Sequence, residues 1–221
     1  MLRREREALR LLGAPGRVGP APRYGCVRLI GELPDGLLLE EVVPGDPVSS
    51  LPDDEATVVL ARCLRALWRP VPVGCGLPTV ERECAALWVG AGLPAPVVER
   101  ARRALTGLLA SAPDAVVLHG DLHHGNLLRT RDGWLAIDPH GLVGEPAYDV
   151  GPLLFNPLER EVAGLVDRRL DLLAAELGLA RERLRRWGLV RAVLACSWSV
   201  QAGEELPSGI WAVAECLASG P

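Results

Sequence analysis

Carboxylate and amide side chains gather in the stretch from residue 119 to residue 138, HGDLHHGNLLRTRDGWLAID. Asp121 and Asn126 lie five residues apart, and Asp138 ends the apolar run that follows them. Oxygen ligands without thiols suit a hard cation such as Mg²⁺, which keeps several waters and shares phosphate oxygens with a nucleotide. The stretch therefore indicates a site for magnesium and phosphate.

Short apolar runs on either side of these residues predict how they are placed. Residues 127–128 and 134–137 are predicted to form two strands, joined by the Arg-Asp-Gly turn at 131–133. A further run at 116–118 leads into the loop that precedes them. Because a hairpin this short brings its two ends close together, the three oxygen-bearing side chains should converge on one pocket.

The spacing matches the arrangement used for phosphoryl transfer. In protein kinases an H-R-D-x-x-x-x-N loop supplies an Asp for the attacking hydroxyl and an Asn for a metal, and the Asp of a later D-F-G holds metal as well. Here His119, Asp121 and Asn126 match the first pattern at the same spacing. Asp138 stands in the place of the D-F-G Asp, although Pro and His occupy positions 139–140.

Two longer motifs carry a resemblance to a known family. HGDLHHGN followed by a strand ending in IDP resembles the aminoglycoside phosphotransferases, and GWLAIDPHGLVGEPAYD resembles their streptomycin 6-kinase branch, the aminoglycoside/hydroxyurea antibiotic resistance kinases. The resemblance implies an α+β, protein-kinase-like fold that transfers phosphate from ATP, with Mg²⁺, to an alcohol group of a small molecule such as streptomycin. It implies that Asp121 orients the acceptor hydroxyl, that Asn126 and Asp138 hold the metal, and that His119 and Asp149 support the loop.

The resemblance extends to the first part of the chain. Residues 2–12 form an amphipathic helical pattern that stops at a glycine, and strands are predicted at 26–33 and 37–43 around a Pro-Asp-Gly turn. On the kinase pattern, Glu5 corresponds to the glutamate of the N-lobe helix. The hinge residues that offer backbone hydrogen bonds to the nucleotide are then Glu40, Glu41 and Val42.

Part of a kinase N-lobe is not found. Only four residues precede Glu5, and all 24 basic residues are Arg, so no lysine can pair with it. We therefore expect a truncated, partial N-lobe over residues 1–43 and a mainly helical C-lobe over residues 44–221, with either a true start upstream of Met1 or lost nucleotide-binding strands. Without those contacts transfer should be slow.

This gap leaves two interpretations open, a phosphotransferase and a non-catalytic kinase-like remnant that binds a ligand or partner. It also leaves the 26–43 hairpin with an unpaired edge. We expect a monomer, with that strand edge as its route to self-association.

Helical patterns dominate the rest of the chain. They cover residues 56–68, 79–90, 94–111, 157–178, 181–203 and 206–218. In aminoglycoside kinases, carboxylates of the C-terminal helices receive cationic groups of the substrate, so the resemblance suggests this role for Glu204 and Glu205. Ordinary solvation of a helix end is the alternative for this pair.

Other chemistries fit the sequence less well. A binuclear metallophosphatase also uses G-D and D-x-H stretches, but His123 and His124 are adjacent and would point in different directions, and no further His-rich block follows. A serine hydrolase would need a G-x-S-x-G elbow, which the sequence lacks. The tryptophans fall on helical faces and are predicted to be core residues.

Composition limits the partners. The net charge of −4 does not favour nucleic acid and is compatible with a cationic aminoglycoside as the small-molecule substrate. No apolar run reaches the roughly 20 residues of a membrane-spanning helix, so no membrane partner is expected. The six scattered cysteines and the absence of a signal peptide indicate reduced thiols in a cytoplasmic protein.

Overall fold

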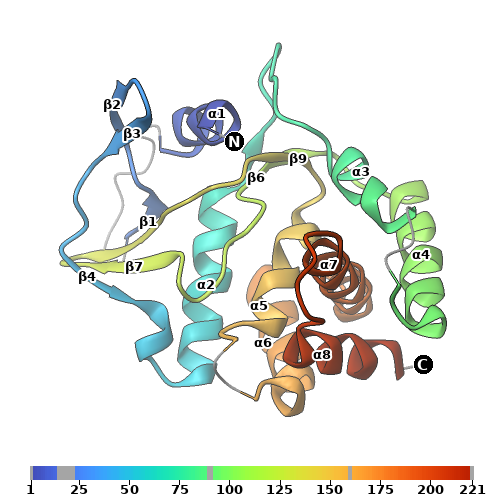
Figure 1. Ribbon diagram of the computed structural model, residues 1–221. Coiled ribbons are helices and arrows are strands. Elements are labelled where there is room, and N and C mark those ends of the chain that lie inside the picture. Colours follow the sequence, from blue (N-terminus) through green and yellow to red (C-terminus); the bar gives the residue numbers. More distant parts are fainter. Residues whose placement is uncertain (1, 14–22, 89–91, 159–160, 220–221) are drawn as a thin grey trace.

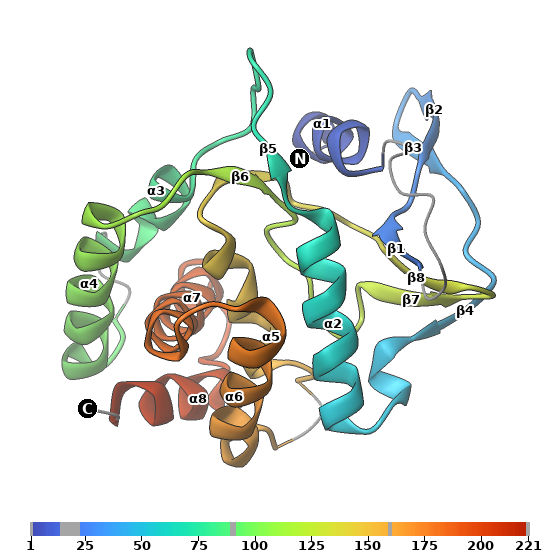
Figure 2. The same cartoon turned by 180° about the vertical axis from the view of Figure 1, so that it is seen from behind.

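The computed structural model describes residues 2–13, 23–88, 92–158 and 161–219. Strands and the first helix lie at one side of the molecule, and a group of helices lies at the other (Figure 1). Helix α2 (Asp53–Leu67) lies between them, as the view from behind shows (Figure 2), and packs against strands on one side and α6 on the other. This mixture of helix and sheet agrees with the α+β prediction.

The predicted hairpin is present in a four-stranded sheet of order β1-β8-β7-β4. Its strands are β1 (Arg23–Cys26), β8 (Gly133–Ala136), β7 (Leu127–Thr130) and β4 (Pro44–Pro47). The first strand runs parallel to β8, with Arg23 opposite Gly133. A Cβ at position 133 would lie 1.9 Å from the Arg23 carbonyl oxygen, so only glycine allows this close pairing.

A second sheet contains the strands that precede and follow the candidate site in the chain. It has the order β5-β6-β9, formed by Arg69–Pro70, Val116–Leu118 and Leu142–Gly144. The middle strand leads directly into His119, and β9 starts four residues after Asp138. The loops that carry the polar residues are therefore fixed at both ends by one sheet.

Helix α7 (Arg181–Gln201) is the centre of the helical side, where it packs against α4, α5 and α8. Buried residues lie on every face of this helix, as expected for a helix that neighbours enclose. The surrounding helices are α4 (Ala95–Ala110), α5 (Gly151–Phe155), α6 (Val166–Leu177) and α8 (Ser208–Ser219). Short helices complete this side: α3 (Val80–Glu83) and 3-10 turns at Cys84–Trp88, Pro146–Val150 and Ala163–Leu165. A further 3-10 turn, at Val48–Ser50, follows β4 on the strand side.

Helix α1 (Leu2–Leu12) is attached to the rest through a buried apolar face and through charged side chains. Arg6 and Arg10 both pair with Glu32, at 3.1 and 2.6 Å, and so hold the β2–β3 hairpin. On another side, Glu7 accepts a hydrogen bond from the Gly76 backbone N–H at 2.6 Å. The apolar face of the helix buries Ala8, Leu9 and Leu12.

Several predicted boundaries were wrong. The strands of the early hairpin are β2 (Leu29–Leu33) and β3 (Gly36–Leu39), because Cys26 pairs with β8 instead. The helix predicted at 79–90 is a single α turn followed by a 3-10 turn in its described part. The helix predicted from 157 starts at Val166, after a 3-10 turn at Ala163–Leu165. In contrast, Gly178 ends α6 in the left-handed conformation, with φ 69°, as expected.

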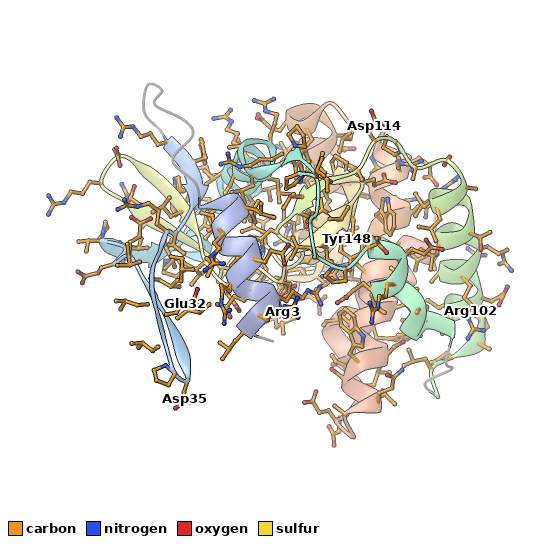
Figure 3. All side chains as sticks on the ribbon, turned by 90° about the horizontal axis from the view of Figure 1, so that it is seen from above. Arg3, Glu32, Asp35, Arg102, Asp114 and Tyr148 are labelled. Atoms are coloured by element: carbon orange, nitrogen blue, oxygen red, sulfur yellow. The ribbon has the colours of Figure 1, made fainter. Side chains whose placement is uncertain are left out.

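The β2–β3 hairpin projects from the molecule, with Asp35 near its tip (Figure 3). Among the described strands, β2 and β3 pair only with each other. Ile30, Leu33 and Leu38 are 55%, 59% and 49% exposed on it. None of the described helices has the length and apolar character needed to cross a membrane. The division into lobes at residue 43 stays a prediction.

The exposed hairpin predicts association at high concentration. Replacing Leu33 by Lys should raise the dimer dissociation constant about tenfold, since an apolar contact of one to two kcal/mol is replaced by a charge at an edge. Sedimentation at several concentrations measures it. Leu158→Lys is the matched control, because Leu158 has the same 59% exposure away from the hairpin. A wild type that stays monomeric at the highest concentration, or equal effects of both substitutions, would contradict this interpretation.

Candidate active site

The hairpin brings the three predicted oxygen-bearing residues to one place. Asn126 donates from Nδ2 to the Asp121 carbonyl oxygen at 3.1 Å, which closes the loop between them. The Asn126 carbonyl oxygen accepts from the Ile137 N–H at 3.0 Å. Asp138 is the next residue, so its backbone lies beside the loop that carries Asp121. Two hydrogen bonds to backbone oxygens therefore bring the Asp121 loop, Asn126 and the end of the strand before Asp138 together.

Asp121 is partly open, with 29% of its side chain exposed. Its Oδ1 lies 3.4 Å from Nη2 of Arg191. Its Oδ2 lies 4.0 Å from Nε2 of His123 and 3.9 Å from Nε2 of His140. The two carboxylate oxygens therefore have different surroundings, one facing a buried cation and the other facing two imidazole rings.

Asp149 binds the backbone of the loop that carries Asp121. It is fully buried, and its Oδ2 accepts from the His119 N–H and from the Trp68 indole, both at 3.1 Å. Its Oδ1 accepts from the Gly120 N–H at 2.7 Å. Burial raises the pKa of Asp149 to about 6, against the lowering effect of these three donors. The residue fits its predicted supporting role.

His119 is a neutral, buried link within the loop. Burial lowers the pKa of His119 to about 4, so the ring is uncharged at neutral pH. Its Nδ1 accepts from the Asp121 N–H at 3.3 Å, and its Nε2 lies 3.0 Å from the Ile137 carbonyl oxygen. These contacts assign the proton to Nε2, which donates to that carbonyl. The ring therefore ties the Asp121 loop to the strand end that carries Asp138.

Asp138 and Glu5 approach each other from opposite segments. Asp138 is exposed and has a left-handed backbone with φ 55°, which is uncommon for a residue other than glycine. Burial and the nearby Asp138 carboxylate raise the pKa of Glu5, and His140 opposes this effect. Arg4 donates from Nε to the Gly141 carbonyl oxygen at 2.9 Å and so ties α1 to the segment after Asp138. The role of Glu5 as the helix glutamate of the kinase pattern stays a prediction.

The donor chemistry at this position fits a magnesium ion with bound phosphate. Asn126 uses its Nδ2 on a protein carbonyl, which leaves Oδ1 as the free oxygen, and Asp138 offers an exposed carboxylate. In the described ranges, no group of three or more His, Cys, Asp or Glu side chains is arranged to hold a metal. Phosphate oxygens and water would have to complete the coordination.

The hinge residues are only partly available to a nucleotide. The Glu40 N–H already donates to the Arg28 carbonyl oxygen at 3.0 Å, and its carboxylate accepts from the Arg28 N–H at 2.7 Å. Glu41 is exposed and Val42 is partly buried in the segment that follows β3. Their role as nucleotide contacts stays a prediction.

Glu204 and Glu205 lie in the exposed connection between α7 and α8. Closer to the site, a cavity of about 680 Å³ is lined by Trp198 from the last part of α7 and by Arg4, Arg82 and Glu83. Within it, Arg4 and Glu83 form an ion pair at 3.2 Å. Trp198 was predicted to be a core residue, and it packs against the core while its partly buried side chain also lines this cavity.

The matches to known proteins fit this geometry. Residues 23–203 match the family model described as aminoglycoside/hydroxyurea antibiotic resistance kinase. The chain belongs to this family. A hydroxyurea phosphotransferase from Kitasatospora aureofaciens is 40% identical over 207 residues, covering 87% of this chain and 60% of the relative. A streptomycin 6-kinase from Streptomyces griseus is 37% identical over 213 residues, covering 88% and 69%. A streptomycin 6-kinase from Streptomyces glaucescens is covered to 64%, so the chain spans less than two thirds of two of these relatives.

Solved structures agree on the fold. A choline/ethanolamine kinase family protein from Mesorhizobium loti has a TM-score of 0.66 at 15% identity, covering 99% of this chain and 77% of that one. An aminoglycoside phosphotransferase, solved with ADP and hygromycin B, also has a TM-score of 0.66 at 15% identity, covering 97% and 83%. The predicted protein-kinase-like fold of the aminoglycoside phosphotransferase type is confirmed.

Several residues at the site of this family member were not identified from the sequence. They are Arg4, Trp68, His140, Tyr148, Arg191 and Trp198. His140 adjoins a matched motif and could have been considered on that ground. Tyr148 lies within the same quoted family motif as His140, whereas Arg4, Trp68, Arg191 and Trp198 are distant from it in the chain.

The neutral state of His119 predicts how stability depends on pH. The folded protein keeps His119 unprotonated down to about pH 4, whereas the unfolded chain binds a proton below about 6.5. Stability from this residue is therefore present above pH 6.5 and lost as the pH falls toward 4. Between pH 7 and pH 5 the loss should be about 2 kcal/mol.

Asp149 opposes this effect, because its raised pKa lets the folded state gain a proton between about pH 6 and 4. The His119→Gln variant isolates the histidine. Urea unfolding of both proteins at pH 7 and pH 5 should show that the destabilisation by the substitution shrinks at the lower pH. A difference in stability that stays constant with pH would contradict the assignment.

Proposed function

We propose that this chain transfers the γ-phosphoryl group of ATP to a hydroxyl group of a small antibiotic molecule. The observation that carries the proposal is the joint placement of Asp121, Asn126 and Asp138 by one hairpin, with the surrounding loop fixed by buried contacts. The named relatives, which act on streptomycin and on hydroxyurea, support the acceptor class.

Asp121 serves the acceptor in this mechanism. The acceptor oxygen attacks the γ-phosphorus while the bond from that phosphorus to the β–γ bridging oxygen breaks, and ADP leaves with the bonding electrons. The proton of the acceptor hydroxyl passes to the Asp121 carboxylate. Because phosphoryl transfer proceeds through a loose transition state, the main contribution of this residue is orientation of the hydroxyl.

Asn126 and Asp138 serve the magnesium–phosphate end. Asn126 would bind through Oδ1 and Asp138 through its carboxylate, and the ion neutralises charge on the phosphate oxygens when bound. Glu5 would serve as the helix glutamate of the kinase pattern, and the charge of Asp138, which contributes to its raised pKa, supports this role. The backbone of Glu40, Glu41 and Val42 would contact the nucleotide, with the Glu40 carbonyl oxygen in place of its engaged N–H.

The cavity beside Trp198 is proposed as the acceptor pocket. Trp198 adjoins Arg191, whose guanidinium carbon lies 5.7 Å from its ring, and Arg191 contacts Asp121. The cavity therefore lies near the residue that would receive the acceptor proton. Glu204 and Glu205, on the connection that follows α7, would receive cationic groups of a larger acceptor such as streptomycin.

The reaction requires ATP, so we place the protein in the cytoplasm, where ATP is produced. It would act there as a monomer on a small molecule. The net charge of −4 gives no support for a nucleic-acid partner.

Replacing Asp121 by Asn tests the division of roles. Transfer should fall by about 10²–10⁴-fold, the usual effect of losing a positioned general base, with Mg-ATP affinity nearly unchanged. Calorimetry with Mg-ATP and a transfer assay with streptomycin and with hydroxyurea measure the two quantities. Asp114→Asn is the control, because Asp114 is an exposed carboxylate between α4 and β6.

Parallel loss of Mg-ATP binding and transfer in Asp121→Asn would contradict this division. A wild-type chain that binds Mg-ATP and phosphorylates neither acceptor would contradict the proposed function and favour the non-catalytic remnant.

Trp198→Ala tests the acceptor pocket. Removal of an aromatic wall should raise KM for the acceptor about tenfold, since contact with such a side chain is worth one to two kcal/mol, and leave KM for ATP unchanged. Steady-state kinetics with each substrate varied in turn distinguish the two. A change confined to KM for ATP would place the acceptor elsewhere.

A further inference from the structure

Helix α7 carries a buried arginine whose guanidinium lies against the loop of Asp121. Arg191 is 3% exposed, and its Nη2 donates to the Gly120 carbonyl oxygen at 3.0 Å and lies 3.4 Å from Asp121 Oδ1. Its Nη1 donates to the Tyr148 hydroxyl at 2.8 Å. One terminal nitrogen therefore binds the loop of Asp121, and the other binds Tyr148 in the 3-10 turn Pro146–Val150.

The guanidinium is held in one orientation by its surroundings. Its central carbon lies 4.6 Å from the centre of the Tyr148 ring and 5.7 Å from that of Trp198. The approach of α7 depends on Gly151, where a Cβ would lie 2.3 Å from the Cβ of Arg191. A planar cation fixed by two rings and two hydrogen bonds can set the position of a neighbouring carboxylate.

The contact distinguishes the two oxygens of Asp121. Oδ1 faces Arg191, whereas Oδ2 faces His123 and His140 at about 4 Å, on the partly exposed side. We propose that Arg191 is a positioning residue that holds the Asp121 carboxylate through Oδ1 and leaves Oδ2 to the acceptor hydroxyl. This inference rests on the proposed role of Asp121.

Charge explains why this contact matters beyond packing. An arginine keeps its charge when buried, and Tyr148 and Gly120 offer it only neutral acceptors. Asp121 is the carboxylate within 4 Å of it among the described residues. Rotation of the Asp121 side chain away from Arg191 would leave a buried cation without its ion pair, which is costly. The carboxylate is therefore restrained while its other oxygen stays available.

Two substitutions of Arg191 and one control test the role. Arg191→Met should lower kcat about 100-fold, the effect of misplacing a catalytic group by about 1 Å, with KM for Mg-ATP changed less than about threefold. Arg191→Lys should recover about tenfold of that loss, because it restores the charge without the planar fork. Arg183→Met is the control, since Arg183 is also on α7 but pairs with Glu145 at 2.5 Å. Its kcat should stay within about threefold of wild type.

A double-mutant cycle of Arg191→Met with Asp121→Asn provides a readout that needs no activity, because each substitution removes one charge of the pair. The unfolding equilibrium constants should show a coupling of about fivefold or more between the two positions. Additive effects, or a kcat within threefold of wild type for Arg191→Met, would overturn the proposal. Failure of the proposed function looks different, because the wild type would then phosphorylate no acceptor while the coupling persisted.

Discussion

The buried carboxylate of Asp149 is the contact on which the rest of the site depends. It gathers the N–H groups of His119 and Gly120 and the indole of Trp68, so it connects the Asp121 loop to helix α2. A buried carboxylate is costly unless donors surround it, and those donors are in turn fixed by it. The tight turn at Gly120, with φ 87°, presents its N–H to this carboxylate and its carbonyl oxygen to Arg191. Gly120 is therefore held by Asp149 through its N–H and by Arg191 of α7 through its carbonyl oxygen.

The two ends of the proposed reaction are held by different forces. The acceptor side depends on α7, which is enclosed by other helices and contributes Arg191 and Trp198. The nucleotide side depends on α1, which buries Leu9 and Leu12 in the core, and on the β2–β3 hairpin, which α1 holds through ion pairs of partly exposed residues such as Arg6 with Glu32. Because exposed ion pairs contribute little free energy, local opening should be easier at this hairpin than around α7.

Much of the site was predictable because its geometry is local. The turn after Thr130 and the short strands around it bring Asn126 and Asp138 together without help from distant segments. The errors came from pairings over long separations. Cys26 was assigned to the early hairpin, but Gly133 lets its strand lie against β8, and that preference for a distant partner has no local signal. Trp198 was predicted to be core because a helical pattern does not distinguish packing against a neighbour from lining a cavity.

The sequence by itself predicted the Asp121–Asn126–Asp138 set, since spacing and hairpin length limit how far apart these residues can lie. It also determined the α+β class and the family. Only the tertiary structure decided that Arg191 contacts Asp121, because the two lie 70 residues apart and α7 is buried on all faces. When every face of a helix is apolar enough to be buried, periodicity cannot tell which one meets the active site. That choice is made by packing against the neighbouring helices and by the space at Gly151.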